Sequence, residues 1–225
     1  MNTLTTRAGG APPLLPAGAS AFLRRALRQG TGIVLLGTVV LGVAAIFSYA
    51  PGDPSLNSAT GNAPENLLGH AGATLADLVL QVAGYGAAVP LLVLAVWGWR
   101  LTHGLAVSSP SWRGLAALMT LALSSLAFAA LDTPGDWPFM TGLGGFAGDL
   151  MLAGALHGID HWRLPMRVAA ADIGIVAGTL AAFGLIIALG MSFSDWRAFV
   201  AALARAAHRA AAGLARAGSW LIRVL

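Results

Sequence analysis

Few side chains in this sequence have a type and spacing that could carry out chemistry. His157 and His161 are four residues apart, with Asp160 between them. On a helix this spacing would place both imidazoles on one face, where they could bind a divalent metal ion. Two ligands and a possible third are too few for a defined metal site, so we interpret these residues as polar groups at the interfacial end of a helix. We therefore predict no metal ion here.

Two carboxylates stand at the start of long apolar runs. Asp77 precedes one run and Asp172 precedes another. An ionisable residue inside a membrane is a candidate functional residue. At a boundary, however, a carboxylate can face water or cap the N-terminus of a helix. We expect capping for both residues. The middle of every apolar run lacks acidic residues, which argues against a proton relay or an ion-coupled transporter.

The sequence also lacks the motifs of common enzyme classes. A Gly-rich phosphate-binding loop of the Walker type needs a lysine, and the chain has none. It has no GxSxG, HExxH or dinucleotide fingerprint. The lack of cysteine excludes thiol catalysis, disulfides and iron–sulfur clusters. We expect no catalytic activity and no cofactor in these residues.

The composition predicts the kind of secondary structure that carries these side chains. The 225 residues are 57% hydrophobic and only 10% charged, whereas an ordinary soluble domain is roughly 25% charged. We predict an all-α membrane protein with several spans. Four apolar runs can cross a bilayer core, which takes about 20 helical residues. These runs cover about 31–50, 78–99, 114–131 and 173–194.

The sequence thus divides into three parts: a disordered, basic tail at 1–29, a four-helix membrane domain at 30–195 and an amphipathic linker helix at 196–225. Within the second outside loop, the uncharged segment 150–159 is too short to cross the bilayer. We expect it to form an interfacial or re-entrant helix.

The arginines predict the orientation. All 13 basic residues are arginine, and only Arg163 and Arg167 fall on the side opposite the termini. Since arginine concentrates in cytoplasmic loops, we expect both termini in the cytoplasm. The C-terminal helix carries a basic stripe, which we expect on the anionic inner leaflet or against a partner rather than on DNA. The stripe consists of Arg205, Arg209, Arg216 and Arg223.

Pairs of glycines favour close packing between helices. The GxxxG spacing occurs at Gly144 and Gly148 and again at Gly174 and Gly178. Such a face can pack within one chain or between subunits, and the spacing leaves both open.

The most distinctive stretch follows the first apolar run and includes two prolines that end it. Its residues, with two in the second span, are Tyr49, Pro51, Asp53, Pro54, Ser55, Asn66, Gly69, Gly72, Ala73, Ala76, Asp77, Gly84 and Pro90. The pattern resembles the four-span N-terminal membrane domain of the FtsK/SpoIIIE family of bacterial DNA translocases. The resemblance covers about residues 30–196, and the glycines at 144–148 resemble a segment of the family's second loop.

The resemblance implies a place in the bacterial inner membrane and a function in cell division and chromosome segregation. Full-length members carry a hexameric motor that uses ATP and magnesium to pump double-stranded DNA, and their membrane domain anchors the motor at the division septum. We expect this chain to act by contacts with other division-machinery membrane proteins and by homo-oligomerisation. The 51–77 loop and the glycine-rich second loop would form its outer surface.

Two other functions stay open. One is an oligomeric pore or channel, which needs a polar stripe on a span. The available polar residues are Thr31, Thr38, Gln81, Thr120, Ser124 and Ser125. The other is a small accessory subunit of a different membrane complex.

Overall fold

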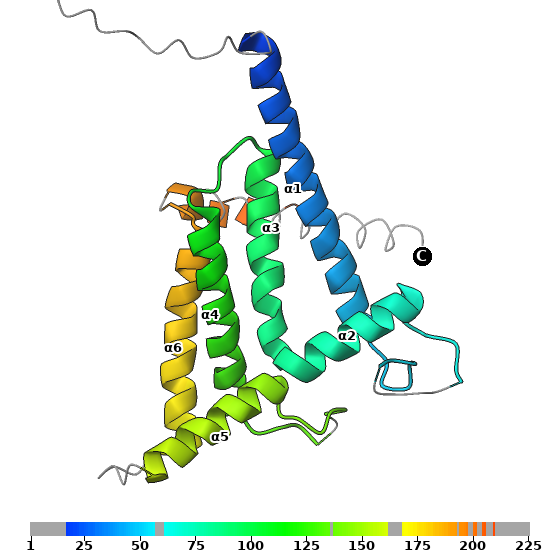
Figure 1. Ribbon diagram of the computed structural model, residues 1–225, viewed down its shortest axis with the longest axis vertical. Helices are drawn as coiled ribbons and strands as arrows, with labels where there is room; N and C mark the ends of the chain where they lie inside the picture. The colour runs from blue at the N-terminus through cyan, green and yellow to red at the C-terminus, as the bar shows by residue number, and fades with distance from the viewer. Residues whose placement is uncertain are drawn as a thin grey trace, which may run out of the picture. The chain divides into compact units, whose positions relative to one another are not determined.

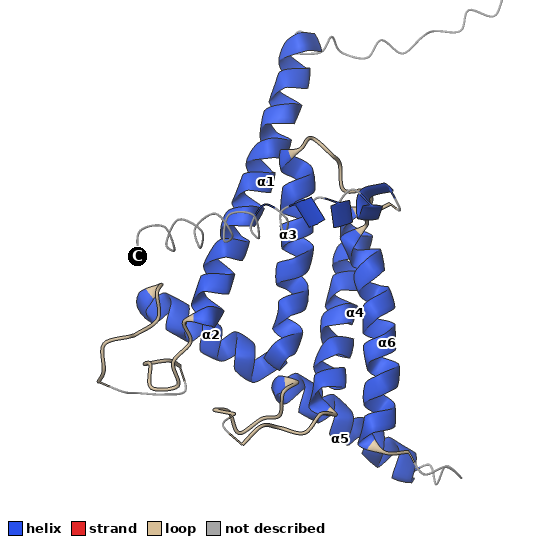
Figure 2. Cartoon of the chain, turned by 180° about the vertical axis from the view of Figure 1, so that it is seen from behind, coloured by secondary structure: helices blue, strands red, loops and turns tan. Residues whose placement is uncertain are grey.

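The computed structural model describes residues 17–56, 61–135, 137–161, 168–192, 194–197, 200–201, 204–205 and 209. This part of the chain is helical and contains no strand (Figure 2). Four helical stretches in it are long and apolar enough to cross a membrane: Gly18–Phe47, Gly69–Thr102, Pro110–Ala129 and Ala170–Leu189. The predicted all-α, four-span class is confirmed.

The chain divides into two compact units. One comprises Met1–Leu78 with Leu91–Val107, and the other comprises Val79–Pro90 with Ser108–Leu225.

The first unit pairs α1 (Ala17–Phe47) with most of α3 (Ala88–Thr102), and the two helices run antiparallel (Figure 1). Close contact depends on small residues. A Cβ atom added at Gly32 would lie 2.7 Å from the carbonyl oxygen of Gly98, and one added at Gly42 would lie 2.9 Å from a methyl group of Leu91. Arg24, Arg25 and Arg28, which we expected in the N-terminal tail, lie in the first turns of α1.

The predicted second span is divided between two helices. α2 (Gly69–Ala83) ends at the 3₁₀ turn η1 (Gly84–Ala87), and α3 follows. Gly84 has a φ of +54°, a left-handed conformation that ends an α-helix. The chain changes direction at this turn (Figure 1). Pro90 lies in the first turn of α3, where a missing N–H costs little.

The second unit contains the remaining helices. α4 (Pro110–Ala129) packs along α6 (Ala170–Leu189), and α5 (Gly145–His161) lies across one end of α4 (Figure 1). α5 is longer than the predicted helix at 150–159, because it begins at Gly145 and includes Asp149. Its location at the membrane interface stays a prediction.

The expected C-terminal linker helix lies mostly outside the described residues. Arg205 and Arg209 are helical and exposed, whereas Arg216 and Arg223 lie outside the described part. The basic stripe therefore stays a prediction.

Candidate functional site

The distinctive loop residues gather between the end of α1 and the first half of α2, all within the first unit. Hydrogen bonds and close backbone contacts join them into one cluster, which we call the loop clasp. The loop clasp consists of Ser48, Tyr49, Asp53, Asn66, Gly69, Gly72 and Asp77.

Asp53 closes the first outside loop on itself. Its backbone N–H donates to the carbonyl of Ala50 at 3.1 Å, which forms a turn. Its carboxylate accepts the backbone N–H groups of Glu65 at 2.8 Å and Asn66 at 3.0 Å. The Asp53 side chain is only 5% exposed, and hydrogen bonds to a buried carboxylate are stronger than neutral ones. A single side chain therefore joins both ends of the 53–66 segment.

Asn66 connects the C-terminus of α1 to the start of α2. Its side-chain amide donates to the carbonyls of Ala45 at 2.8 Å and Ser48 at 3.2 Å. Its side-chain oxygen accepts the N–H of Leu68 at 3.0 Å. The last carbonyls of a helix lack partners within the helix, and Asn66 supplies two donors to this end of α1. The residue is 4% exposed, so these bonds form away from water.

Ser48 and two glycines complete the connection. The Ser48 hydroxyl donates to the carbonyl of Ala44 at 2.6 Å and accepts the N–H of Leu67 at 3.0 Å. Gly69 begins α2 with a φ of +62°, which favours glycine. A Cβ atom at Gly72 would collide with the side-chain oxygen of Asn66. A glycine at position 72 therefore leaves the space that Asn66 occupies.

The prediction that Asp77 caps a helix is wrong. α2 begins at Gly69, so Asp77 lies in the middle of that helix, with Ala73 and Ala76 fully buried beside it. Asp77 is itself buried and accepts a hydrogen bond from the Tyr49 hydroxyl at 3.3 Å. Burial, together with the negative charge of Asp77 and this hydrogen bond, raises the pKa of Tyr49 to about 12.

Two prolines restrict the turn that follows α1. Pro51 is exposed, and Pro54 and Ser55 are partly buried. Proline fixes φ near −65° and so reduces the freedom of the unfolded loop. The polar atoms of Asp53 and Asn66 are directed into the protein and hydrogen-bonded there. The loop clasp is thus suited to holding a shape rather than to reacting with a ligand.

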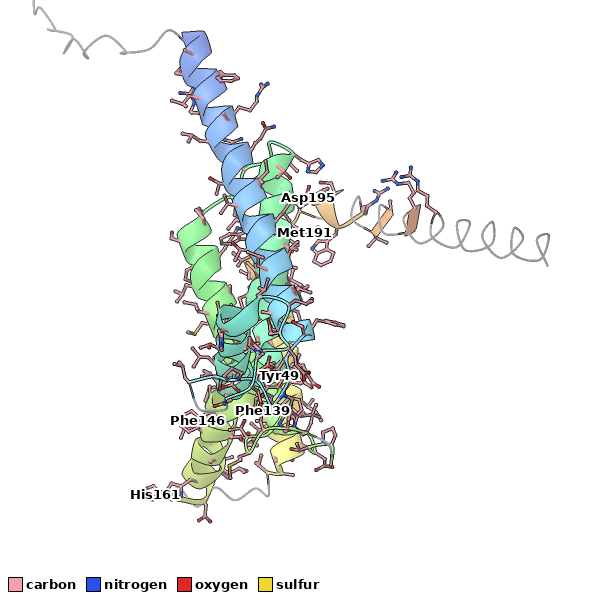
Figure 3. All side chains as sticks on the ribbon, turned by 90° about the vertical axis from the view of Figure 1, so that its right-hand side faces the viewer. Tyr49, Phe139, Phe146, His161, Met191 and Asp195 are labelled. Carbon is pink, nitrogen blue, oxygen red and sulfur yellow. The ribbon has the colours of Figure 1, made fainter. Side chains whose placement is uncertain are left out.

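The histidine pair lies elsewhere, on α5 of the second unit. The rings of His157 and His161 stack with their centroids 6.3 Å apart, and His161 lies at the tip of the helix (Figure 3). Within the described residues, no three His, Cys, Asp or Glu side chains come together as they would to hold a metal ion.

A second glycine-dependent contact lies where η1, α4 and the start of α5 meet. The N–H of Tyr85 donates to the carbonyl of Leu143 at 2.9 Å. A Cβ atom at Gly84 would collide with that same carbonyl, and Cβ atoms at Gly144 and Gly148 would collide with the carbonyl of Ser125. These three glycines of the sequence prediction therefore lie where two backbones approach closely.

Ser125 also joins this contact, a role that its place in the sequence does not predict. Its hydroxyl donates to the carbonyl of Ala83 at 3.0 Å, at the end of α2, and the residue is almost fully buried. The only sign of such a role in the sequence is the spacing of this serine from other small residues, which resembles the spacing in a GxxxG pair.

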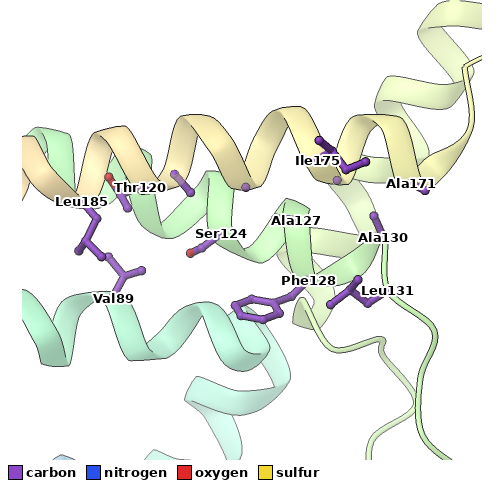
Figure 4. Close-up of a pocket in the computed structure, with 14 residues that line it drawn as sticks. Val89, Thr120, Ser124, Ala127, Phe128, Ala130, Leu131, Ala171, Ile175 and Leu185 are labelled. Carbon is purple, nitrogen blue, oxygen red and sulfur yellow. The ribbon is translucent and has the colours of Figure 1, made fainter.

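The other predicted glycine pair faces a helix of the same chain. A Cβ atom at Gly174 would lie 2.6 Å from that of Ala130, and one at Gly178 would lie 3.6 Å from that of Ala127. An apolar groove of about 630 Å³ follows this α4–α6 contact (Figure 4). This face of α6 therefore packs against α4 of the same chain.

The hydroxyl groups that could line a pore are hydrogen-bonded to carbonyl groups of the helix backbone. Thr120 and Ser124 of α4 donate to carbonyls of their own helix, those of Ala116 at 2.7 Å and Leu121 at 2.9 Å. Both residues are buried. Thr38 of α1 likewise donates to Val34 at 3.1 Å. These hydroxyl groups satisfy the backbone instead of forming a polar stripe.

Charged residues cap both ends of α6. Asp172 accepts the N–H of Ala169 at 2.9 Å, as expected for a helix cap. At the other end, the guanidinium of Arg113 donates to the carbonyls of Ile187 and Ser108, both at 2.6 Å. A cation at a helix C-terminus is favourable. The Arg113 contact was not predicted, because its partner is 74 residues away in the sequence.

The fold and the loop clasp together define a class of protein. Four apolar helical stretches, few charges and a hydrogen-bonded loop after the first span are the features of a multi-pass membrane domain. Residues 24–201 match the family model described as the 4TM region of DNA translocase FtsK/SpoIIIE. The chain belongs to this family and forms its membrane-anchoring domain. The match is to the membrane region, in agreement with the prediction that these residues carry no enzymatic activity.

Curated relatives agree with this assignment. A DNA translocase FtsK of Azospirillum brasilense is 33% identical over 213 residues, which are 92% of this chain and 31% of the relative. One of Agrobacterium fabrum is 32% identical over 172 residues, 76% of this chain and 19% of the relative. The chain thus spans less than a third of these relatives. No solved structure gives a significant match.

Proposed function

We propose that this membrane domain brings an FtsK-like translocase to the division septum, and that its first outside loop is the surface that division partners contact. The observation that carries the proposal is the combination of a fixed loop and exposed apolar side chains. The loop clasp fixes the backbone on either side of residues 57–60. Leu56 is 81% exposed and Leu67 is 76% exposed. Apolar side chains presented on a rigid loop are suited to protein–protein contact.

The distribution of charge supports the proposed orientation. In the first unit, the acidic residues Asp53, Glu65 and Asp77 belong to the loop end of α1, whereas Arg24, Arg25 and Arg28 lie at its other end. In the second unit, Arg113 lies at the end of α4 where α6 finishes, and α5 lies at the opposite end. This arrangement suits cytoplasmic termini and one outside loop in each unit.

We further propose that the chain forms homo-oligomers, as hexameric members of the family do. Gly174 and Gly178 contact α4 of the same chain, so the faces that join subunits would be other ones. α1 is one candidate, because Ile33, Val34 and Val40 are exposed on it. ATP hydrolysis and the pumping of double-stranded DNA would belong to a motor region and not to these residues.

The two rival functions receive less support. A pore needs polar groups that face a common channel, and the hydroxyl groups of α4 are instead bonded within the helix bundle. An accessory subunit of an unrelated complex would not be expected to match the translocase family over most of its length.

Septal localisation of a full-length translocase that carries this domain tests the proposal. The variant L56Q/L67Q changes only the exposed apolar side chains and should lose septal fluorescence and cause filamentation at normal expression. The matched control is Leu105→Gln, an exposed leucine in the loop between α3 and α4. Normal septal recruitment of L56Q/L67Q would contradict the proposed contact surface.

A further inference from the structure

A polar pocket at the N-terminal end of α1 belongs to none of the functions described above. It lies in the first unit and has a volume of about 520 Å³. Its lining residues are Ala21, Arg24, Arg25, Arg28, Gln29, His103 and Gly104. None of the lining residues is acidic, and three carry a permanent positive charge.

The pocket is held in shape by hydrogen bonds between α1 and the end of α3. Arg28 donates to the carbonyl of Gly104 at 2.9 Å, and Gln29 donates to the carbonyl of Thr102 at 3.4 Å. The His103 ring is fixed by a 2.8 Å contact with the carbonyl of Trp99. Arg24 lies one helical turn before Arg28, so it projects over the same face of α1.

The positive charge has no counterion within the first unit. The acidic residues of this unit are Asp53 and Glu65 in the first outside loop and Asp77 in α2, and all three lie beyond the other end of α1. At a helical rise of 1.5 Å per residue, the 19 residues from Arg28 to Phe47 span about 28 Å. Charges separated by that distance are screened by salt. The neutralising group must therefore come from outside this unit.

The same length sets the depth of the pocket in a membrane. The hydrocarbon core is about 30 Å thick, so an α1 that reaches one surface at Phe47 places Arg28 at the headgroup level of the other. Trp99 lies beside His103, with 4.7 Å between ring centroids. Tryptophan gathers at this depth.

We propose that the pocket binds the phosphate headgroup of an anionic phospholipid. Arg24 and Arg25 contact the phosphate, because a guanidinium matches its oxygens with two parallel N–H groups. Arg28 stays on the carbonyl of Gly104 and adds its charge. A lipid is favoured over nucleic acid because the pocket lies at the depth where lipid phosphates are concentrated, beside an apolar span that the acyl chains can follow.

Native mass spectrometry of the full chain in detergent tests this proposal, with phosphatidylglycerol and phosphatidylcholine as probes. We expect the first phosphatidylglycerol to bind at least 10-fold more tightly than phosphatidylcholine. The variant R24Q/R25Q should weaken phosphatidylglycerol binding by about 10- to 30-fold, since each arginine near an anionic surface contributes about a factor of 5. Both side chains are exposed, so the helical content measured by circular dichroism should not change.

The matched control is Arg197→Gln, which removes an exposed helical arginine outside the pocket and should leave this first binding step within 2-fold. An equal loss in both variants would mean non-specific charge attraction and would overturn the proposal. It would also be overturned if soluble glycerol phosphate bound as tightly as the lipid, or if a short DNA duplex bound with the same dependence on Arg24 and Arg25 while phosphatidylglycerol did not.

Discussion

Replacing Asn66 with aspartate should strongly destabilise the fold, although the two side chains have nearly the same volume. The carbonyls of Ala45 and Ser48 now accept hydrogen bonds from the Asn66 amide at 2.8 and 3.2 Å. An ionised carboxylate would place oxygen against oxygen at both positions, in a site that is 4% exposed. A buried carbonyl that loses its partner costs about 1–3 kcal/mol, so the loss of two gives about 3 kcal/mol or more.

The assay is unfolding of the purified chain in mixed micelles, where helical content is followed as the denaturing detergent increases. The variant should recover part of its stability at low pH, because a protonated carboxyl can donate one of the two lost hydrogen bonds. The pKa of this buried acid is raised in the folded state, so its folded form is favoured at low pH and loses stability as the pH rises.

The control is Asn62→Asp, which makes the same chemical change at an exposed position of the same loop. It should change the free energy of unfolding by less than about 0.5 kcal/mol. If Asn66→Asp proved equally mild, the loop clasp could not be the connection that holds α1 to α2, and the structural role assigned to it would be refuted.

Four further predictions concern other positions. Gly84→Ala should destabilise the fold by about 3 kcal/mol, because φ is +54° and a Cβ atom would meet the backbone. Gly154→Ala, in open space on α5, should instead stabilise by about 0.5–1 kcal/mol in the same unfolding assay. Arg113→Gln should speed hydrogen exchange at the C-terminal turn of α6, whose carbonyl it now binds, and unchanged exchange would show that the contact is not formed. In a Tyr85→Phe background, absorbance titration should show Tyr49 ionising near pH 12 rather than near pH 10, as a free phenol does. The neutral Tyr49 side chain therefore contributes its full stability to the folded state below pH 10, and this contribution is lost as the pH rises toward 12.

Much of the fold could be predicted because it depends on local properties. Lengths of apolar runs and the positions of charges were enough for the four-span class. The residues of the first outside loop were recognisable as a pattern. Their interactions were not, because Tyr49 and Asp77 are 28 residues apart and Asn66 reaches back 21 residues to Ala45.

The wrong prediction for Asp77 has a physical cause. A charged residue before an apolar run resembles a helix boundary, yet α2 extends eight residues before Asp77 and buries its carboxylate against Tyr49. The break at Gly84 was hidden for a similar reason. An apolar run gives no sign that a backbone carbonyl from Leu143 will lie where a Cβ atom would be.

We propose that the loop clasp holds a contact surface on the outer side of the membrane and that both termini lie in the cytoplasm. The chain has no cysteine, so single cysteines can be introduced at Leu56 and, as a matched exposed site, at Leu105. A membrane-impermeant maleimide applied to intact spheroplasts should label Leu56→Cys at once and label Leu105→Cys only after permeabilisation. The reverse pattern, or equal labelling of the two, would contradict the account.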